Sequence, residues 1–476
     1  MRPSILFAGS AALAATLVAI SPIAAQQAPS GPTPARTPAA SPAAPARLDA
    51  TIRRQVVDTM AERLRRHYAE ADTGRMIAEH VQARLQAGAY DTVTNPLRFA
   101  ELLTSDLQAV NGDGHLYVLY QPDNPGLRVG PEGIRMQGPP PGARPAPSRP
   151  PAGPPPGAVE QARRAHWGLG RVDVLSGNVG YLDVRGFFNG PEVETAMVNA
   201  LRYLEGTDAV IIDLRRNGGG SAQSVNFLLS HFTTSDTVAS LTVTNRSGNE
   251  RFTRYTLAQV PGPRRPDVPL YVLTSGFTAS AGEDFAFVLK NMGRATLVGA
   301  TTAGAGRNNA TMAVGHGFLT SVSFSRVQDP RTGKEWEKVG VQPDLVVDPV
   351  SALDRAHVMA LEKIAAKTED AAHKRVMGLL RETIEAQAMP RAVSIAELQA
   401  YVGSYEGGRT VSLDAATGRL LYSARKGAMG EPLVALGEGT FAMGPTRLVF
   451  EREGARVVRV KIVLPGGEAL TYRLAQ

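Results

Sequence analysis

The sequence contains no cysteine in its 476 residues. This absence excludes disulfide bonds, thiolate metal sites and the lipid-attachment cysteine of a lipoprotein. Long apolar runs are also scarce, because no segment after the N-terminal one is long enough to cross a bilayer. The net charge is +7, yet no Lys/Arg block interleaved with aromatic residues occurs, which does not favour nucleic-acid binding.

The N-terminus predicts export. Arg2 precedes an apolar stretch over residues 5–23, and two alanines end the segment. This pattern is typical of a secretory signal peptide, with cleavage expected before Gln26. We therefore expect a periplasmic or extracellular protein that keeps no integral membrane span after cleavage.

Composition and periodicity predict an α/β protein in several parts. Strands expected at 179–184, 209–214, 238–244, 269–273, 294–299 and 319–324 alternate with helices, which indicates a layered domain with a largely parallel sheet. Short alternating segments near the C-terminus predict a small all-β domain. The expected layout is a signal peptide (1–25), a Pro/Ala-rich linker (26–47), an N-terminal helical cap (48–125), a Pro-rich insert (126–165), a core domain (166–350), a helical segment (351–390) and a C-terminal β-domain (391–476).

Ser280 lies where a buried strand passes into a helix that begins at Ala281. A serine there can be a nucleophile, since the N–H groups of the first helical turn face any anion that forms beside it. It can also be an ordinary N-cap, with Glu283 completing a capping box. No Gly-x-Ser-x-Gly pattern surrounds it, so the serine taken alone favours the cap, and the case for a nucleophile depends on the rest of the chain.

Two glycine-rich turns accompany this serine. Gly218, Gly219 and Gly220 follow a buried strand, either as a helix entry or to bring a backbone N–H beside Ser280; their spacing is not that of a phosphate-binding loop. His115 lies in a second turn, between a helix and a strand. By residue type alone, a turn histidine is more often a surface residue than a general base, although Gly112 and Gly114 keep its surroundings open.

Four motifs in order carry a resemblance to a known family: Asp213–Gly220, Thr278–Glu283, Gly293–Gly299 and Val339–Asp344. Together they resemble the C-terminal processing peptidases, a family that includes the tricorn protease core and the repeats of interphotoreceptor retinoid-binding protein. The helical unit that ends at His115 resembles the N-terminal cap of the retinoid-binding-protein-like branch. The resemblance implies a crotonase-like (ββα repeat) peptidase core at residues 166–350.

The same resemblance implies the chemistry. Ala305 stands where Ser-Lys members carry their lysine, and no PDZ domain is evident, so the chain is more similar to the tricorn-like branch with a Ser-His-Glu triad. Matching residue by residue gives Ser280, His115 and Glu337, with no metal or cofactor. The oxyanion would be held by N–H groups of Ala281 and of either Gly219 or Gly220. Without the resemblance, Glu337 would be read as a solvated member of the charged segment 334–338.

The expected function is therefore that of an exported serine peptidase acting on a peptide or protein through an acyl-enzyme. Two alternatives remain open: a non-catalytic binding protein for an apolar ligand on the same fold, and an esterase or amidase for non-peptide substrates. The sequence does not predict the oligomeric state or the cleavage preference.

Overall fold

The computed structural model describes residues 48–122, 158–246 and 250–475. The predicted signal peptide and linker lie outside these residues, as does the Pro-rich insert up to residue 157. The end of the predicted insert is helical, since α4 spans Ala158–Arg164 and a short 3₁₀ turn follows at His166–Gly168. No helix in the described ranges combines the length and the apolarity that crossing a membrane requires.

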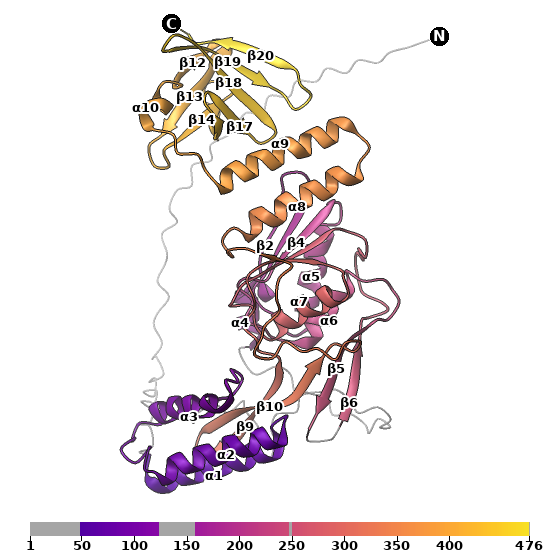
Figure 1. Ribbon diagram of the computed structural model, residues 1–476, viewed down its shortest axis with the longest axis vertical. Coiled ribbons are helices and arrows are strands. Elements are labelled where there is room, and N and C mark those ends of the chain that lie inside the picture. The colour runs from indigo at the N-terminus through magenta and orange to yellow at the C-terminus, as the bar shows by residue number, and fades with distance from the viewer. Residues whose placement is uncertain (1–47, 123–157, 247–249, 476) are drawn as a thin grey trace, which may run out of the picture. The chain divides into compact units, whose positions relative to one another are not determined.

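The central feature is a six-stranded sheet, counted over the described residues (Figure 1). Its order is β11-β8-β7-β4-β3-β2, and every neighbouring pair is parallel except β2 with β3. The strands are β2 (Leu169–Leu175), β3 (Val179–Val184), β4 (Ala209–Asp213), β7 (Leu270–Thr274), β8 (Thr296–Gly299) and β11 (Leu345–Val346). The predicted mixed α/β class with a largely parallel sheet is confirmed.

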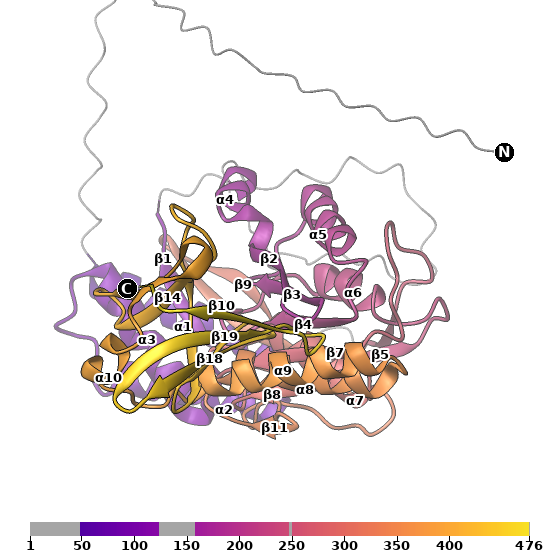
Figure 2. The same ribbon diagram turned by 90° about the horizontal axis from the view of Figure 1, so that it is seen from above.

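Both faces of this sheet are covered, as its almost continuous apolar strands require. Alternate residues of β4 point to opposite sides: Ile212 joins the core with α5 (Pro191–Tyr203), α6 (Ala222–Ser230) and α7 (Ala281–Asn291). Ile211 joins the core with α8 (Ala352–Lys367) and α9 (Ala371–Ala388), which lie side by side (Figure 2). The strand period of two thus assigns each side chain to one of the two layers.

A second sheet is antiparallel and contains strands that the sequence had assigned to the parallel one. It consists of β1 (Tyr117–Tyr120), β10 (Phe318–Gln328), β5 (Ala239–Asn245), β6 (Glu250–Tyr255) and β9 (Arg307–Gly315). The placement of 238–244 and 319–324 in the α/β alternation was therefore wrong. Their apolar pattern correctly predicts strands. The sheet to which they belong was predicted wrongly, because they pair with β6 and β9, two strands that were not predicted.

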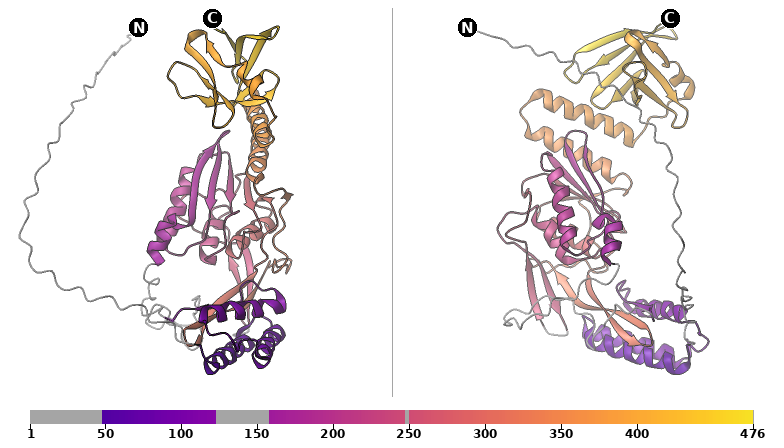
Figure 3. Two further views of the ribbon diagram at one scale, coloured as in Figure 1. Left: turned by 90° about the vertical axis from the view of Figure 1, so that its left-hand side faces the viewer. Right: turned by 180° about the vertical axis from the view of Figure 1, so that it is seen from behind.

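The helical unit packs on the hairpin of β9 and β10 (Figure 3). The three predicted helices are present as α1 (Ala50–His67), α2 (Ala71–Gln86) and α3 (Pro96–Asn111). Asn95 caps α3 by accepting two backbone N–H groups, and Gly112 ends it with a left-handed conformation (φ +71°). β1 follows directly and pairs with β10, which fixes the turn between α3 and β1 against the second sheet.

The C-terminal segment contains one short helix and two small antiparallel sheets. Their shared core is rich in aromatic side chains, among them Tyr401, Phe441 and Phe450. The elements are α10 (Ile395–Gln399), β12 (Gly403–Tyr405), β13 (Arg409–Asp414), β14 (Arg419–Ser423), β15 (Glu431–Pro432), β16 (Val434–Gly437), β17 (Thr440–Met443), β18 (Thr446–Glu453), β19 (Arg456–Val463) and β20 (Ala469–Arg473).

Candidate active site

Ser280 occupies the junction between β7 and α7 in an unusual backbone conformation. Its φ is +53° and its ψ is −116°. An ordinary N-cap serine is extended, and a non-glycine residue with positive φ is uncommon. Such strained residues persist only where neighbouring groups hold them, and they concentrate at functional sites. The conformation therefore sets Ser280 apart from a routine helix cap.

The carboxylate of Glu283 holds this junction together. Its side chain is buried and accepts four hydrogen bonds, from the N–H of Ser280 (2.8 Å), the N–H of Ala305 (2.8 Å), the N–H of Gly304 (2.6 Å) and the hydroxyl of Thr302 (2.5 Å). Burial raises the pKa of Glu283, while these donors act in the opposite direction. The predicted capping role of Glu283 toward Ser280 is present, but the connection to residues 302–305 is new.

The glycine run lies against the serine. A Cβ atom on Gly219 would come within 2.9 Å of the Ser280 Cβ and 3.3 Å of the Ala281 nitrogen, so no side chain fits there. The N–H of Gly219 already donates to Asn217 Oδ1 (2.9 Å). In the described part of the chain, the N–H groups of Gly220 and Ala281 have no hydrogen-bond acceptor. Of the two glycines expected as oxyanion donors, Gly220 is thus the one whose N–H is free.

His115 comes from the turn between α3 and β1. β1 pairs with β10 so that Tyr117 faces Ser321. Continuing this antiparallel register by two residues places His115 level with Ser323, whose partner on β9 is Asn309. The second sheet therefore brings the turn of the helical unit to the beginning of β9, close to the segment 302–306 that Glu283 holds.

Asp113 is a carboxylate in direct contact with His115. Its side chain is fully buried and accepts the N–H of His115 (2.9 Å) and the hydroxyl of Tyr68 (2.9 Å). His115 Nδ1 is 3.9 Å from Asp113 Oδ1, beyond hydrogen-bond distance, and it has no hydrogen-bond partner among the described residues. Sequence reasoning missed Asp113; its position two residues before His115, typical of an Asx turn, was the available signal.

Burial lowers the pKa of His115, and the charge of Arg307 lowers it further, while Asp113 raises it. A lowered pKa favours the neutral imidazole that a general base requires at neutral pH. Arg307 itself forms an ion pair with Glu70 (2.6 Å) at the start of α2. The histidine thus lies between one negative and one positive group.

Glu337 is a partly buried carboxylate rather than a freely solvated one. Its Oε2 accepts the N–H of Gly306 (2.7 Å). Burial and, next, the negative charge of Asp113 raise the pKa of Glu337 to about 7, against Arg307 and Lys338, which lower it. Glu337 and Asp113 therefore interact electrostatically, although they are far apart in the sequence.

The expected line of hydrogen bonds is not formed. Over the described ranges, no hydrogen bond joins the Ser280 hydroxyl, the His115 ring and the Glu337 carboxylate. Catalytic contacts are often long without substrate and tighten in the working complex. Lys290, the lysine nearest in sequence to the serine, points away, because it donates to the carbonyl of Gln342 (2.6 Å) and pairs with Asp344 (3.0 Å).

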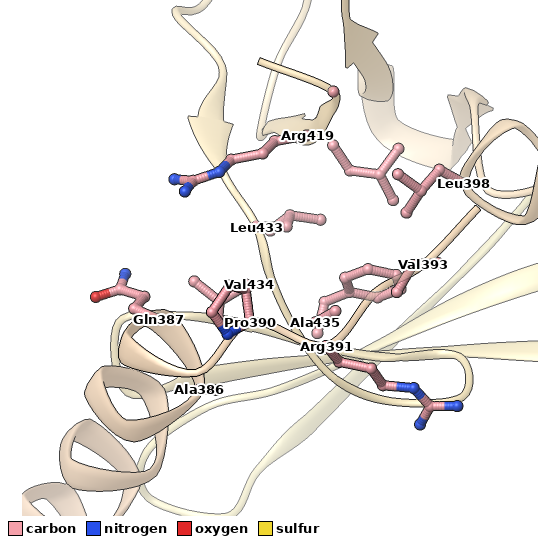
Figure 4. A pocket seen from close by; sticks show the side chains of 13 residues that line it. Ala386, Gln387, Pro390, Arg391, Val393, Leu398, Arg419, Leu433, Val434 and Ala435 are labelled. Atoms are coloured by element: carbon pink, nitrogen blue, oxygen red, sulfur yellow. The ribbon is translucent and has the colours of Figure 1, made fainter. Parts of the chain in front are cut away.

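Two other features bear on the choice of site. No group of three or more His, Asp or Glu residues that could hold a metal occurs within the described residues. A cavity of about 120 Å³ lies between the end of α9 and the C-terminal strands, with walls that include Leu398, Leu433 and Phe441 (Figure 4). None of the candidate catalytic residues lines it.

Comparison with known families gives matches to two parts of the chain. The model for peptidase family S41 matches residues 178–347, and the model for the N-terminal domain of this peptidase in eukaryotic IRBP matches residues 48–148. Residues 178–347 are therefore similar to peptidase family S41. The matched region includes Ser280 and Glu337, and the N-terminal match includes His115.

Curated relatives match part of the chain. The carboxyl-terminal-processing protease of Synechocystis is 33% identical over 173 residues, which is 36% of this chain and 38% of the relative. The carboxy-terminal processing protease CtpB of Bacillus subtilis is 28% identical over 204 residues, 42% of this chain and 41% of the relative. The chain thus spans about two fifths of the length of these relatives, which are serine peptidases.

Solved structures give weaker matches. The photosystem II D1 C-terminal processing protease is 27% identical with a TM-score of 0.31, over 36% of this chain and 43% of that one. A lipoprotein from Streptococcus agalactiae is 16% identical with a TM-score of 0.44, over 65% of this chain and 96% of that one.

Proposed function

We propose that this chain is an exported serine peptidase that cleaves peptide bonds through Ser280, His115 and Glu337. The observation that carries the proposal is the conformation of Ser280, held at φ +53° by a buried carboxylate beside the free N–H groups of Ala281 and Gly220. A structural cap needs none of these features. The names of the curated relatives support a peptide or protein substrate processed near its carboxyl end.

The chemistry follows from these groups. His115, neutral near pH 7 because burial lowers its pKa, accepts the proton of the Ser280 hydroxyl as the oxygen attacks the carbonyl carbon. The N–H groups of Ala281 and Gly220 bind the oxyanion. The imidazolium then protonates the leaving amine, and water, deprotonated by the same histidine, releases the acyl group from the serine.

The proposal extends to the layout of the chain. The peptidase core at residues 166–350 would have the crotonase-like ββα repeat, with the helical cap at 48–125 supplying the base. The helical segment at 351–390 and the β-domain at 391–476 carry no candidate catalytic group and would serve packing or substrate binding. Export rests on the predicted signal peptide at residues 1–25.

A fluorophosphonate probe followed by peptide mapping tests the proposal. We expect covalent label on Ser280 and none in Ser280→Ala. Ser394→Ala is the matched control, since Ser394 caps α10 by accepting the N–H of Glu397 (3.1 Å) far along the chain from the site; it should label like the wild type. Absence of label on the wild-type Ser280 would favour a non-catalytic binding protein. Matched peptide amides and esters then separate a peptidase from an esterase.

A further inference from the structure

Asp113 is a buried charged group that the proposed triad does not use. Its side chain has no exposed surface. Burying a carboxylate is costly unless hydrogen bonds compensate it. Here one oxygen accepts the N–H of His115 and the other accepts the hydroxyl of Tyr68, which in turn accepts the amide of Asn111 (2.7 Å). A buried and fully hydrogen-bonded carboxylate next to a candidate general base suggests that Asp113 has a role in the function of His115.

The network fixes the turn that carries His115. Asn111 ends α3 and its side chain accepts the N–H of Asp113 (3.2 Å), while the carbonyl of Asp113 accepts the N–H of Leu116 (3.2 Å). Tyr68 follows α1, and its carbonyl accepts a hydrogen bond from Arg246, which directly follows β5 of the second sheet (3.0 Å). The end of α1 is thereby joined both to the His115 turn and to the sheet.

We propose that Asp113 is a positioning residue for His115. It holds the main chain of the turn through the His115 N–H, and its buried carboxylate lies 3.9 Å from the ring nitrogen Nδ1. The inference rests on the proposed function in assigning His115 as the base. The ring nitrogen Nδ1 has no hydrogen-bond partner among the described residues, which leaves the nearby carboxylate unopposed by a competing acceptor.

The charged groups around His115 come from four elements. Asp113 lies on its own turn, Arg307 begins β9, and Glu70 at the start of α2 pairs with Arg307. Glu337 lies between β10 and β11 and interacts electrostatically with Asp113. The charges that act on the His115 ring are those of Asp113, which raises its pKa, and Arg307, which lowers it.

NMR titration of the His115 ring tests this without relying on catalysis. The signals of the eight histidines are followed with pH, and His115 is assigned from a His115→Gln sample. Asp113→Asn removes a charge that stabilises the imidazolium, so the pKa of His115 should fall. Glu337→Gln should change it less. Asp106→Asn is the matched control, because Asp106 also accepts a tyrosine hydroxyl, that of Tyr90 (2.6 Å), but lies within α3 and is not among the groups that act on His115; it should leave the pKa of His115 unchanged.

Kinetics on the same variants test the positioning role. Asp113→Asn should lower kcat by about 10- to 100-fold, as loss of a supporting partner of a functional histidine does, and move the acidic limb of the kcat/KM profile downward in pH. Tyr68→Phe keeps the carboxylate but removes the hydroxyl that donates to it. The turnover should therefore fall by less than in Asp113→Asn, and the acidic limb should move slightly upward, because the charge of Asp113 is less shielded. Tyr90→Phe removes an equivalent buried hydroxyl and should affect thermal stability only.

If Asp113→Asn does not fold, the His115 pKa and the turnover of Tyr68→Phe still test the proposal. An unchanged His115 pKa in both variants overturns the proposal, as does a Glu337→Gln shift as large as that of Asp113→Asn. If the wild type neither hydrolyses peptides nor reacts with the probe, the proposed function fails, and the titration still reports whether Asp113 faces His115.

Discussion

Two junctions of the central sheet each place a serine directly before a helix. β4 leads to α6 through Ser221, and β7 leads to α7 through Ser280. Ser221 is extended (φ −81°, ψ 122°), and its hydroxyl accepts the N–H groups of Gln223 and Ser224. Ser280 has the same residue type at the same topological position but a strained backbone. The difference teaches that residue type predicts a cap, whereas conformation distinguishes a cap from a candidate nucleophile.

The largest effect should come from Ser280→Ala. Hydrolysis should fall by several orders of magnitude, since removing a triad serine abolishes the acyl-enzyme route. The thermal midpoint should move by only a few degrees, because loss of a capping hydroxyl costs about 1 kcal/mol. Steady-state kinetics and a melting curve on one sample check both. Persistent hydrolysis in the alanine variant would return Ser280 to the same class as Ser221.

Glu337→Gln should have the next largest effect. The β7–α7 junction connects to Glu337 through residues 302–306, and a glutamine can neither stabilise the imidazolium nor fix its tautomer. Turnover should fall heavily, but less than in Ser280→Ala.

The pH dependence of activity is an independent test of whether the Glu337 carboxylate is required. Its pKa is raised to about 7, so the carboxylate form, and activity that needs it, grows as pH rises through 7. The inflection near 7 should vanish in the glutamine variant, while the inflection of His115 at lower pH stays. A fully active variant with an unaltered profile would leave the enzyme with a Ser-His dyad.

Gly219→Ala tests whether the close packing of the glycine turn against Ser280 is needed for turnover. Its Cβ would lie 2.9 Å from that of Ser280, and its φ of +115° disfavours any side chain. Displacing the serine and the adjoining oxyanion donors should cost about 100-fold in kcat. Gly218→Ala is the control, since its Cβ meets only the Phe277 ring at 3.6 Å, an ordinary contact. Equal kinetics for both variants would show that close packing at Gly219 is unimportant for turnover.

The sequence predicts the local elements of the site better than their assembly. Helix α7 begins at Ala281 as expected, because a serine followed by apolar residues at helical spacing is a local signal. The strain at Ser280 could not be predicted, since it depends on Glu283 bonding a segment some twenty residues further along. Asp113 was missed for a related reason: its burial arises from Tyr68, forty-five positions earlier.

Strand partners show the same limit. The apolar pattern of 319–324 indicates a strand but not its sheet, which is decided by pairing with β1, β5 and β9. β9 itself, Arg307–Gly315, is polar in its first half and gives a weak strand signal. Since His115 precedes β1 and Arg307 begins β9, the surroundings of His115 depend on the pairings of this sheet and could not be predicted from local pattern.

The smallest effect, and the one that completes the comparison, is that of Ser221→Ala. Its hydroxyl satisfies two N–H groups at the start of α6, at 3.2 and 3.4 Å, so its loss leaves helix donors without their partner. Because an N-cap serine contributes about 1 kcal/mol, the urea midpoint should fall with an unchanged denaturant slope. Fluorophosphonate should still label Ser280, as the nucleophile is intact. Label found on Ser221 in the wild type, or labelling of Ser280 lost with Ser221 on a folded protein, would show that the two serines do not have separate roles.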